Sequence, residues 1–139
     1  MVRETKVRVR YAETDQMGVV YHANYLVWME LGRTEYGKPD GFVYSELERE
    51  GIVMTVVEAN VRYLNAARYD EEVTVRTRIA ESNARRVVFH YELVVVEGEG
   101  KERRVATGET KHLFCALSSD KRELKLTKLP EKWRWFFEA

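Results

Sequence analysis

The sequence has 139 residues, of which 45% are hydrophobic and 33% are charged. This length suits one domain of ~100–200 residues, whose core is large enough to be stable without disulfides. The 23 basic residues balance 23 acidic ones, so no net field would attract nucleic acid, and we expect no nucleic-acid partner. No segment approaches the ~18 apolar residues of a membrane span, so we expect no stable membrane insertion.

Two features of the sequence bear on the cellular location. Cys115 is the only cysteine, which excludes an internal disulfide framework and suits a reducing compartment. The first residues, MVRETKVRVR, lack the apolar stretch of a secretion signal. We therefore expect a cytoplasmic protein that forms a single domain over residues 1–139.

The first half of the chain predicts a strand followed by helices. In residues 5–13, Val7, Val9 and Tyr11 alternate with charged residues, as in a half-buried strand. From Ala23 to about Tyr36 the pattern becomes helical, and in YLVWMELG only Glu30 is charged. A helix that is apolar nearly all round has to be buried on most sides. The run FVYSELERE predicts a short amphipathic helix before a glycine.

The second half alternates with the period of two that is typical of strands, and hairpin-length connections indicate antiparallel pairing. A short strand at RELKL follows the long ones. These elements predict an α+β fold, in which one curved antiparallel sheet wraps around a long central helix. The residues expected to share a face in each long strand are Val57, Ala59, Val61 and Tyr63; Val73, Val75, Thr77 and Ile79; Val87, Phe89, Tyr91, Leu93 and Val95; and Lys111, Leu113, Cys115 and Leu117.

The tail LPEKWRWFFEA predicts a last helix with one apolar face. Leu129, Trp133, Phe136 and Phe137 lie on that face. Few basic residues flank the tail, so we expect it to dock on the sheet or on a partner subunit rather than on a membrane.

The stretch ETDQMGVVYHAN, which joins the first strand to the apolar helix, is the candidate functional site. Asp15 precedes a glycine by three positions, so it can be a turn residue. However, the chain runs from His22 straight into the buried helix, and a helix N-terminus presents free N–H donors and partial positive charge. A carboxylate beside an oxyanion site is suited to acyl transfer.

The segment VRYAETDQMGVVYHANYLVWMELGRTE resembles the signature of the hotdog-fold acyl-CoA thioesterases of the hydroxybenzoyl-CoA thioesterase group, most closely the Tol–Pal-associated acyl-CoA thioesterases. VRYLNAARYDEEVTVRTRI and ATGETKHLFCAL also resemble that family's later strands. The resemblance implies a hotdog fold and hydrolysis of an acyl-CoA to the free acid and CoA. It also implies dimers with shared active sites, and often tetramers, so we expect a homodimer or homotetramer.

By this resemblance Asp15 is the catalytic carboxylate, and the His22 backbone N–H binds the thioester carbonyl. Asp15 can act as a nucleophile or as a general base, and the His22 side chain can contact Asp15, contact the acyl group or simply pack. The candidate substrate-binding residues are Gly18, Val19, Tyr21, Asn24, Tyr25, Met29 and Glu58. Asn24 is more easily explained as a capping or loop-fixing residue, and Tyr25 and Met29 as core residues. Glu58 would approach a neighbouring protomer's site.

Other interpretations remain open at this point. Glu30 either pairs with Arg33 or is a second active carboxylate. The three histidines are far apart and lack ligand spacing, so we expect no metal site and no cofactor. A protein that binds acyl-CoA without turnover, or acts as a scaffold, is the alternative function. We expect self-association through apolar residues on the outer sheet face, namely Val88, Val94 and Val96. The arginines Arg76, Arg78, Arg85 and Arg86 are left unassigned between CoA phosphate binding and a solvated sheet face.

Overall fold

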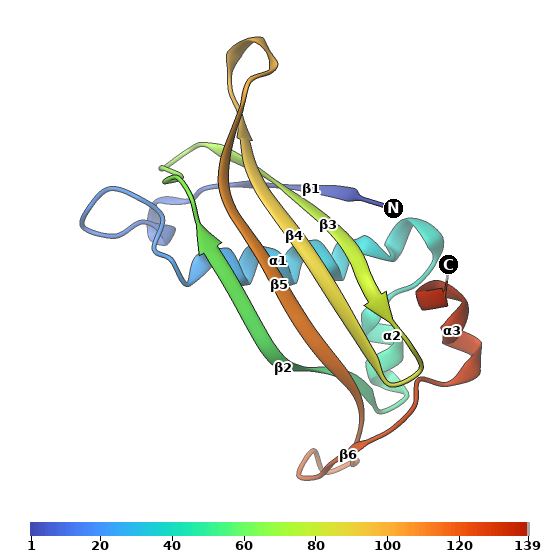
Figure 1. The fold of residues 1–139 in the computed structure, drawn as a ribbon. Coiled ribbons are helices and arrows are strands. Elements are labelled where there is room, and N and C mark those ends of the chain that lie inside the picture. The colour runs from blue at the N-terminus through green and yellow to red at the C-terminus, as the bar shows by residue number, and fades with distance from the viewer. Residues whose placement is uncertain (139) are drawn as a thin grey trace.

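The computed structural model describes residues 1–138, which form one antiparallel sheet with helices on one side and at one end (Figure 1). The strand order is β1-β3-β4-β5-β2, and β6 adds to β5. The expected α+β fold, with a curved sheet around a central helix, is confirmed. The elements are β1 (Arg3–Arg8), a 3-10 turn (Tyr11–Glu13), α1 (Asn24–Tyr36), a second 3-10 turn (Lys38–Asp40), α2 (Tyr44–Arg49), β2 (Ile52–Tyr63), β3 (Glu72–Ser82), β4 (Arg86–Val96), a third 3-10 turn (Gly98–Gly100), β5 (Glu102–Leu117), β6 (Leu124–Leu126) and α3 (Glu131–Glu138).

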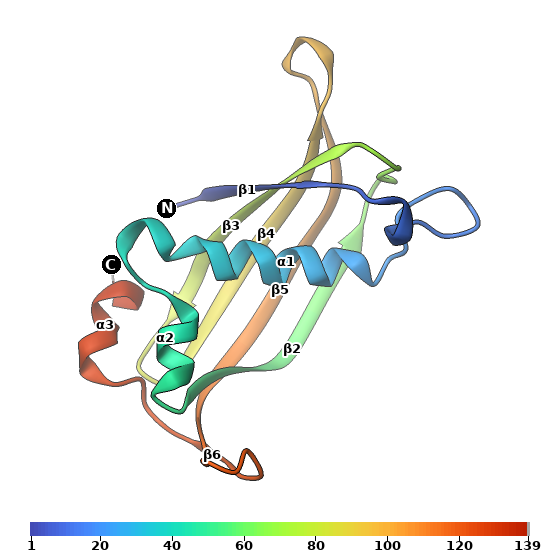
Figure 2. The same ribbon diagram turned by 180° about the vertical axis from the view of Figure 1, so that it is seen from behind.

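Helix α1 lies across the inner face of the sheet (Figure 2). Two glycines allow its close approach. A Cβ on Gly32 would lie only 2.5 Å from Thr77 Oγ1 on β3, and Gly108 on β5 leaves space for Met29. The prediction that α1 is buried on most sides is wrong for the single chain, because Leu26, Val27 and Leu31 are exposed on the opposite side of the helix. An apolar helix surface is therefore left uncovered.

The expected inner faces of β3 and β4 are confirmed: Val73, Val75 and Thr77 are buried on β3, Ile79 is half-buried against the core, and every predicted residue of β4 is buried. The face predicted for β5 is wrong. In the antiparallel register, Thr110 is opposite Phe89 and His112 is opposite Val87, and directly opposed residues point to the same side of a sheet. Thr110, His112 and Phe114 therefore face the helix in place of Lys111, Leu113, Cys115 and Leu117.

The first strand is shorter than predicted. It ends at Arg8, and although Val9 is buried, Tyr11 begins the 3-10 turn and is 77% exposed. The strand ends early because the carboxylate of Glu13 accepts a hydrogen bond from the Arg10 backbone N–H at 2.8 Å. This bond turns the chain away from β3 and towards the start of α1.

The C-terminal helix packs on the protein's own core, as expected. Phe136 stacks on Phe42 with ring centroids 4.4 Å apart, and Phe137 meets Phe114 edge to face. Leu129 is fully buried before the helix begins. Across residues 1–138, the structure has no helix long and apolar enough to cross a membrane.

The outer sheet face is not the apolar patch that the sequence predicts. Val88 and Val94 are buried, and only Val96 is exposed. Both buried valines lie where the register with a neighbouring strand shifts, and such bulges change which side a residue faces. Exposed apolar residues instead lie on the edge strand β2, where Val56 and Val57 are 45% and 55% exposed.

Candidate active site

The loop between the first 3-10 turn and α1 is closed by its own hydrogen bonds. The Asp15 N–H donates to the Val19 carbonyl at 2.9 Å, and the Gly18 N–H donates to the Asp15 carbonyl at 3.0 Å. Gly18 has a φ of +77°, the left-handed conformation that this turn requires. The Asp15 carboxylate accepts the Met17 N–H through Oδ1 at 2.8 Å, so Asp15 is a turn residue. Its other oxygen, Oδ2, accepts no hydrogen bond from residues 1–138 and is free for chemistry.

The N-terminus of α1 lies next to this loop, and no side chain of residues 1–138 caps it. The Tyr21 N–H donates to the Glu13 carbonyl, and the Asn24 N–H donates to the Tyr21 carbonyl. By contrast, the backbone N–H groups of His22 and Ala23 donate to no acceptor in the described part of the chain. Free N–H groups and the positive end of the helix dipole together favour an anionic oxygen at this point.

Asp15 and His22 line the same cavity, whose volume is about 280 Å³. Its opposite wall follows the end of β2, where the Tyr63 hydroxyl donates to the His22 carbonyl at 3.3 Å. The Leu64 and Asn65 N–H groups both bond the Val105 carbonyl, which fixes this wall to β5. The complete lining is Asp15, Met17, Val19, Val20, His22, Tyr25, Tyr63, Leu64, Asn65 and Ala66.

Four of the predicted site residues meet at this cavity, namely Asp15, Val19, His22 and Tyr25. The residues at 63–66 were missed, because no local pattern shows that the end of β2 would fold over His22. Burial is the main cause that raises the pKa of Tyr25, so its phenol stays neutral.

The other predicted site residues lie elsewhere. Gly18 only forms the turn, and Tyr21 packs its ring beside the His22 ring at 4.5 Å. Asn24 fixes the loop, since its side-chain amide donates to the Glu13 carbonyl at 2.9 Å. Met29 is fully buried in the core. Glu58 lies opposite Lys111 in the sheet and forms an ion pair with it at 2.8 Å, so it points away from the cavity.

Sequence reasoning also missed Glu13, which is only 5% exposed. Its carboxylate accepts the Arg10 backbone N–H at 2.8 Å and the Trp28 indole N–H at 2.9 Å. Burial alone would raise the pKa of Glu13, but the hydrogen bonds from Arg10 and Trp28 and the Arg10 charge together lower it. No local pattern in YAETD distinguishes this buried carboxylate from a solvated one.

A second cavity, of about 580 Å³, lies between α1, α2 and β2 and is bordered by Glu30, Arg33, Tyr44 and Met54. The ion pair between Glu30 and Arg33, one of the two alternatives for Glu30, is absent from the structure of residues 1–138. Arg33 instead lies near buried groups of the sheet. Burial, followed by the charge of Arg33, lowers the pKa of His112 to about 4.

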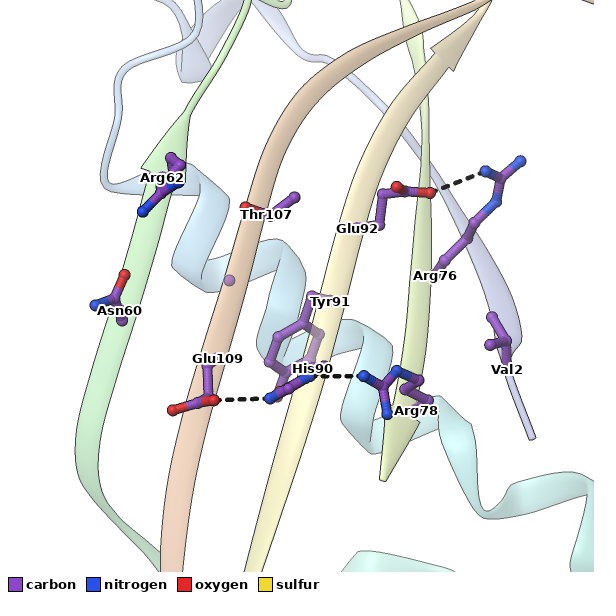
Figure 3. A pocket seen from close by; sticks show the side chains of 11 residues that line it. Val2, Asn60, Arg62, Arg76, Arg78, His90, Tyr91, Glu92, Thr107 and Glu109 are labelled. Carbon is purple, nitrogen blue, oxygen red and sulfur yellow. Dashed lines mark hydrogen bonds and ion pairs between the residues drawn. The ribbon is translucent and has the colours of Figure 1, made fainter. Parts of the chain in front are cut away.

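A third cavity, of about 530 Å³, lies on the outer sheet face, but its charged groups satisfy one another (Figure 3). Arg76 forms ion pairs with Glu4, Glu92 and Glu102. In the same face the His90 ring lies 2.9 Å from Arg78 and 2.7 Å from Glu109. Arg86 is paired as well, with Glu81. These contacts account for Arg76, Arg78 and Arg86 as parts of a solvated, hydrogen-bonded and ion-paired surface, and Arg85 stays unassigned.

The arrangement around Asp15 therefore has the parts that hydrolysis of an acyl group needs. Oδ2 of Asp15 is placed where a carboxylate could attack a carbonyl carbon or activate water, and the His22 N–H is a donor of the kind that can stabilise a developing oxyanion. Within residues 1–138, no group of three histidine, cysteine or acidic side chains is placed to hold a metal ion.

Comparison with known proteins gives a consistent result. A family model described as the thioesterase-like superfamily matches residues 9–135. The chain is 47% identical over 98 residues to the putative acyl-CoA thioesterase YneP of Bacillus subtilis, covering 70% of this chain and 71% of that protein. Among solved structures, the DHNA-CoA thioesterase from Staphylococcus aureus superposes with a TM-score of 0.85 and 32% identity, covering 99% of this chain and 87% of that one. The hypothetical protein TT1821 from Thermus thermophilus superposes with a TM-score of 0.81 and 36% identity, covering 99% and 94%.

Proposed function

Because the chain belongs to the thioesterase-like superfamily, we propose that it is an acyl-CoA thioesterase that hydrolyses the thioester bond to a free acid and CoA. One observation carries the proposal: within residues 1–138, the Asp15 carboxylate oxygen and the His22 backbone N–H that form no hydrogen bond belong to residues that line one cavity. Relatives named as acyl-CoA thioesterases support the choice of substrate class.

The proposed reaction begins with the thioester carbonyl at the N-terminus of α1. As the carbonyl carbon is attacked, negative charge grows on its oxygen, and the His22 N–H and the helix dipole stabilise that charge. Asp15 either attacks the carbon itself, which gives a mixed anhydride that water then hydrolyses, or takes a proton from an attacking water. CoA leaves as the thiol in both routes. The bond from the Met17 N–H holds the Asp15 side chain in place for either role.

The proposed enzyme is a homodimer that associates through β2. This strand is one edge of the sheet, and next to it the loop after the first 3-10 turn projects beyond the sheet (Figure 1). If two β2 edges pair antiparallel over their whole length, the Tyr63 end of one strand lies beside the Ile52 end of the other. The Asp15 cavity of one copy would then face the Met54 cavity of the second copy.

Such a composite site would bind the acyl group between two protomers. Val56 and Val57 on β2 and Val27 on α1, which are exposed in the single chain, would become buried. A tetramer made of two such dimers is the proposed larger assembly. The cytoplasm remains the proposed location, because its reducing conditions suit the free Cys115 thiol and it contains CoA esters.

The test is release of free CoA thiol from a panel of short, long and aromatic acyl-CoAs. Asp15→Asn keeps the size of the side chain and the bond to Met17 but removes both nucleophile and base. We expect kcat to fall by about 10²–10⁴-fold or more with an unchanged melting temperature. His22→Ala keeps the backbone donor and should lose less.

Two results would count against the proposal. Near-normal kcat in folded Asp15→Asn would return Asp15 to its role as a turn residue. Binding of acyl-CoAs without hydrolysis by the wild-type protein would support the alternative, a protein that binds acyl-CoA but does not turn it over.

A further inference from the structure

We propose that Glu13 is the positioning residue of this site. Its hydrogen bonds hold the loop that contains Asp15, at both ends of that loop, against the N-terminus of α1. The inference rests on the proposed function, because it concerns the same carboxylate and the same helix end. Glu13 touches no substrate in this proposal. It determines where Asp15 and the His22 N–H lie relative to each other.

The geometry of the Glu13 contacts supports this role. The Glu13 carboxylate accepts the Arg10 backbone N–H and the Trp28 indole N–H, at 2.8 and 2.9 Å. The Glu13 carbonyl accepts the Tyr21 N–H and the Asn24 side-chain amide, at 2.8 and 2.9 Å. We call this set of four bonds the Glu13 clamp. It joins a residue before the loop to three residues at and inside the start of α1.

The spacing along the chain makes the clamp relevant to chemistry. Asp15 follows Glu13 by two positions, and His22 directly follows Tyr21. Each reacting group is thus at most two residues from an atom that the clamp fixes. The Asp15 loop has few other attachments: the Val20 N–H bonds the Ala67 carbonyl, and the loop residues otherwise bond mainly to one another. Displacement of Glu13 should therefore move Asp15 relative to the helix N-terminus.

The carboxylate is suited to the task because it is charged and buried. A bond from a neutral donor to an ionised acceptor is about twice as strong as a neutral one. Each side-chain oxygen of Glu13 accepts one N–H group. Glutamine has the same shape, but its NH₂ group would face one of these N–H groups, so one bond would be replaced by a repulsive contact.

The chain provides a control with the same pair of groups at an exposed position. Glu50 accepts the Trp133 indole N–H at 2.6 Å, and it also pairs with Lys132. This second carboxylate–indole bond fixes α3, on the far side of the core from the Asp15 loop. Glu50→Gln and Glu13→Gln thus remove the same kind of bond, and only Glu13→Gln disturbs the loop.

The experiment compares Glu13→Gln and Trp28→Phe with Glu50→Gln, at a temperature well below all melting points. For Glu13→Gln we expect kcat on the best acyl-CoA to fall by roughly 10²-fold, the effect of about 1 Å of misplacement, with KM changed much less. Trp28→Phe should share part of this loss of kcat. The double variant Glu13→Gln/Trp28→Phe should lose no more kcat than Glu13→Gln alone, because both substitutions affect the same Glu13–Trp28 hydrogen bond. Glu50→Gln should keep the wild-type kcat.

Hydrogen exchange provides a readout that does not depend on activity. Backbone amides of residues 14–23 should exchange faster in Glu13→Gln than in wild type, and those amides should be unchanged in Glu50→Gln. Unchanged exchange and kcat in Glu13→Gln, while Asp15→Asn is inactive, would overturn the clamp and leave the proposed function standing. Faster exchange with unchanged kcat would also overturn it. If the wild-type protein hydrolyses no acyl-CoA, the proposed function fails, and the exchange result alone decides whether Glu13 fixes the loop. Should Glu13→Gln fail to fold, Trp28→Phe carries the same comparison.

Discussion

His112 makes the stability of this protein depend on pH in a way that one substitution can isolate. Its ring is buried in the core, donates to or accepts from Thr110 Oγ1 through Nε2 at 2.8 Å, and meets Phe89 edge to face at 5.5 Å. Burial and the charge of Arg33 lower the pKa of His112 to about 4. In the unfolded chain the same side chain has a pKa of about 6.5.

The sign of the effect follows from which state takes up the proton. Between about pH 6.5 and about pH 4 the unfolded state binds a proton at His112 and the folded state does not. The contribution of neutral His112 to the free energy of unfolding is therefore fully present at neutral pH and is lost as the pH falls. Linkage with these two pKa values predicts that the free energy of unfolding falls by about 2 kcal/mol between about pH 7.5 and about pH 5.

The variant His112→Phe removes the titrating group and keeps a ring in the same space. It loses the bond to Thr110, which should cost about 1 kcal/mol at neutral pH. Urea unfolding of both proteins, at one protein concentration, gives the free energy of unfolding at each of the two pH values. Comparing the change with pH in wild type and in the variant cancels the contributions of the other titrating groups. We expect wild type to lose about 2 kcal/mol more than the variant on acidification. Equal losses in the two proteins would refute the assignment of a buried, neutral His112.

Three further changes test the packing, the second carboxylate and the assembly. Gly32→Ala should lower the melting temperature, although alanine favours helices by about 1 kcal/mol, because its Cβ would lie 2.5 Å from Thr77 Oγ1; a raised melting temperature would contradict the close packing of α1. Glu30→Gln should change KM or stability more than kcat in steady-state assays, and a kcat loss as deep as that of Asp15→Asn would transfer the catalytic role to Glu30. Val57→Lys, on the exposed edge of β2, should shift the sedimenting species from dimer to monomer without loss of circular dichroism, and an unchanged dimer would place the interface elsewhere.

The sequence predicted those parts of the fold in which the side-chain type alone determines burial. The inward residues of β3 and β4 are mainly apolar, so their alternation identified the buried faces correctly. On β5 the inward face includes Thr110 and His112. Thr110 is tolerated there because the Tyr91 hydroxyl on β4 bonds to it, and the His112 ring bonds in turn to Thr110 on its own strand. A local pattern carries no information about such a cross-strand partner, so the apolar residues on the other side misled the prediction.

In the candidate site, too, some residues could be predicted from a local segment and others depend on the tertiary fold. Asp15 and His22 stand in one continuous segment, and their proximity to a helix start could be predicted from that segment. Tyr63 comes from the far end of β2, and its contact with His22 depends on how the sheet curves around α1. The sequence does not show the partner of Glu58, and the register that puts Glu58 opposite Lys111 explains why its side chain points outward.

Under the proposed function, Asp15 combines two roles that the sequence presents as alternatives. As a turn residue it uses Oδ1 to accept the Met17 N–H, and this bond restricts the side chain to one orientation. The same restriction leaves Oδ2 as the oxygen that is available to a substrate. A carboxylate that already makes one fixed bond needs less reorganisation to reach a reactive position than a freely rotating one. The turn is therefore part of the proposed catalytic device, and the exposed apolar surface of α1 and β2 beside it is where we expect a second copy to complete the cavity.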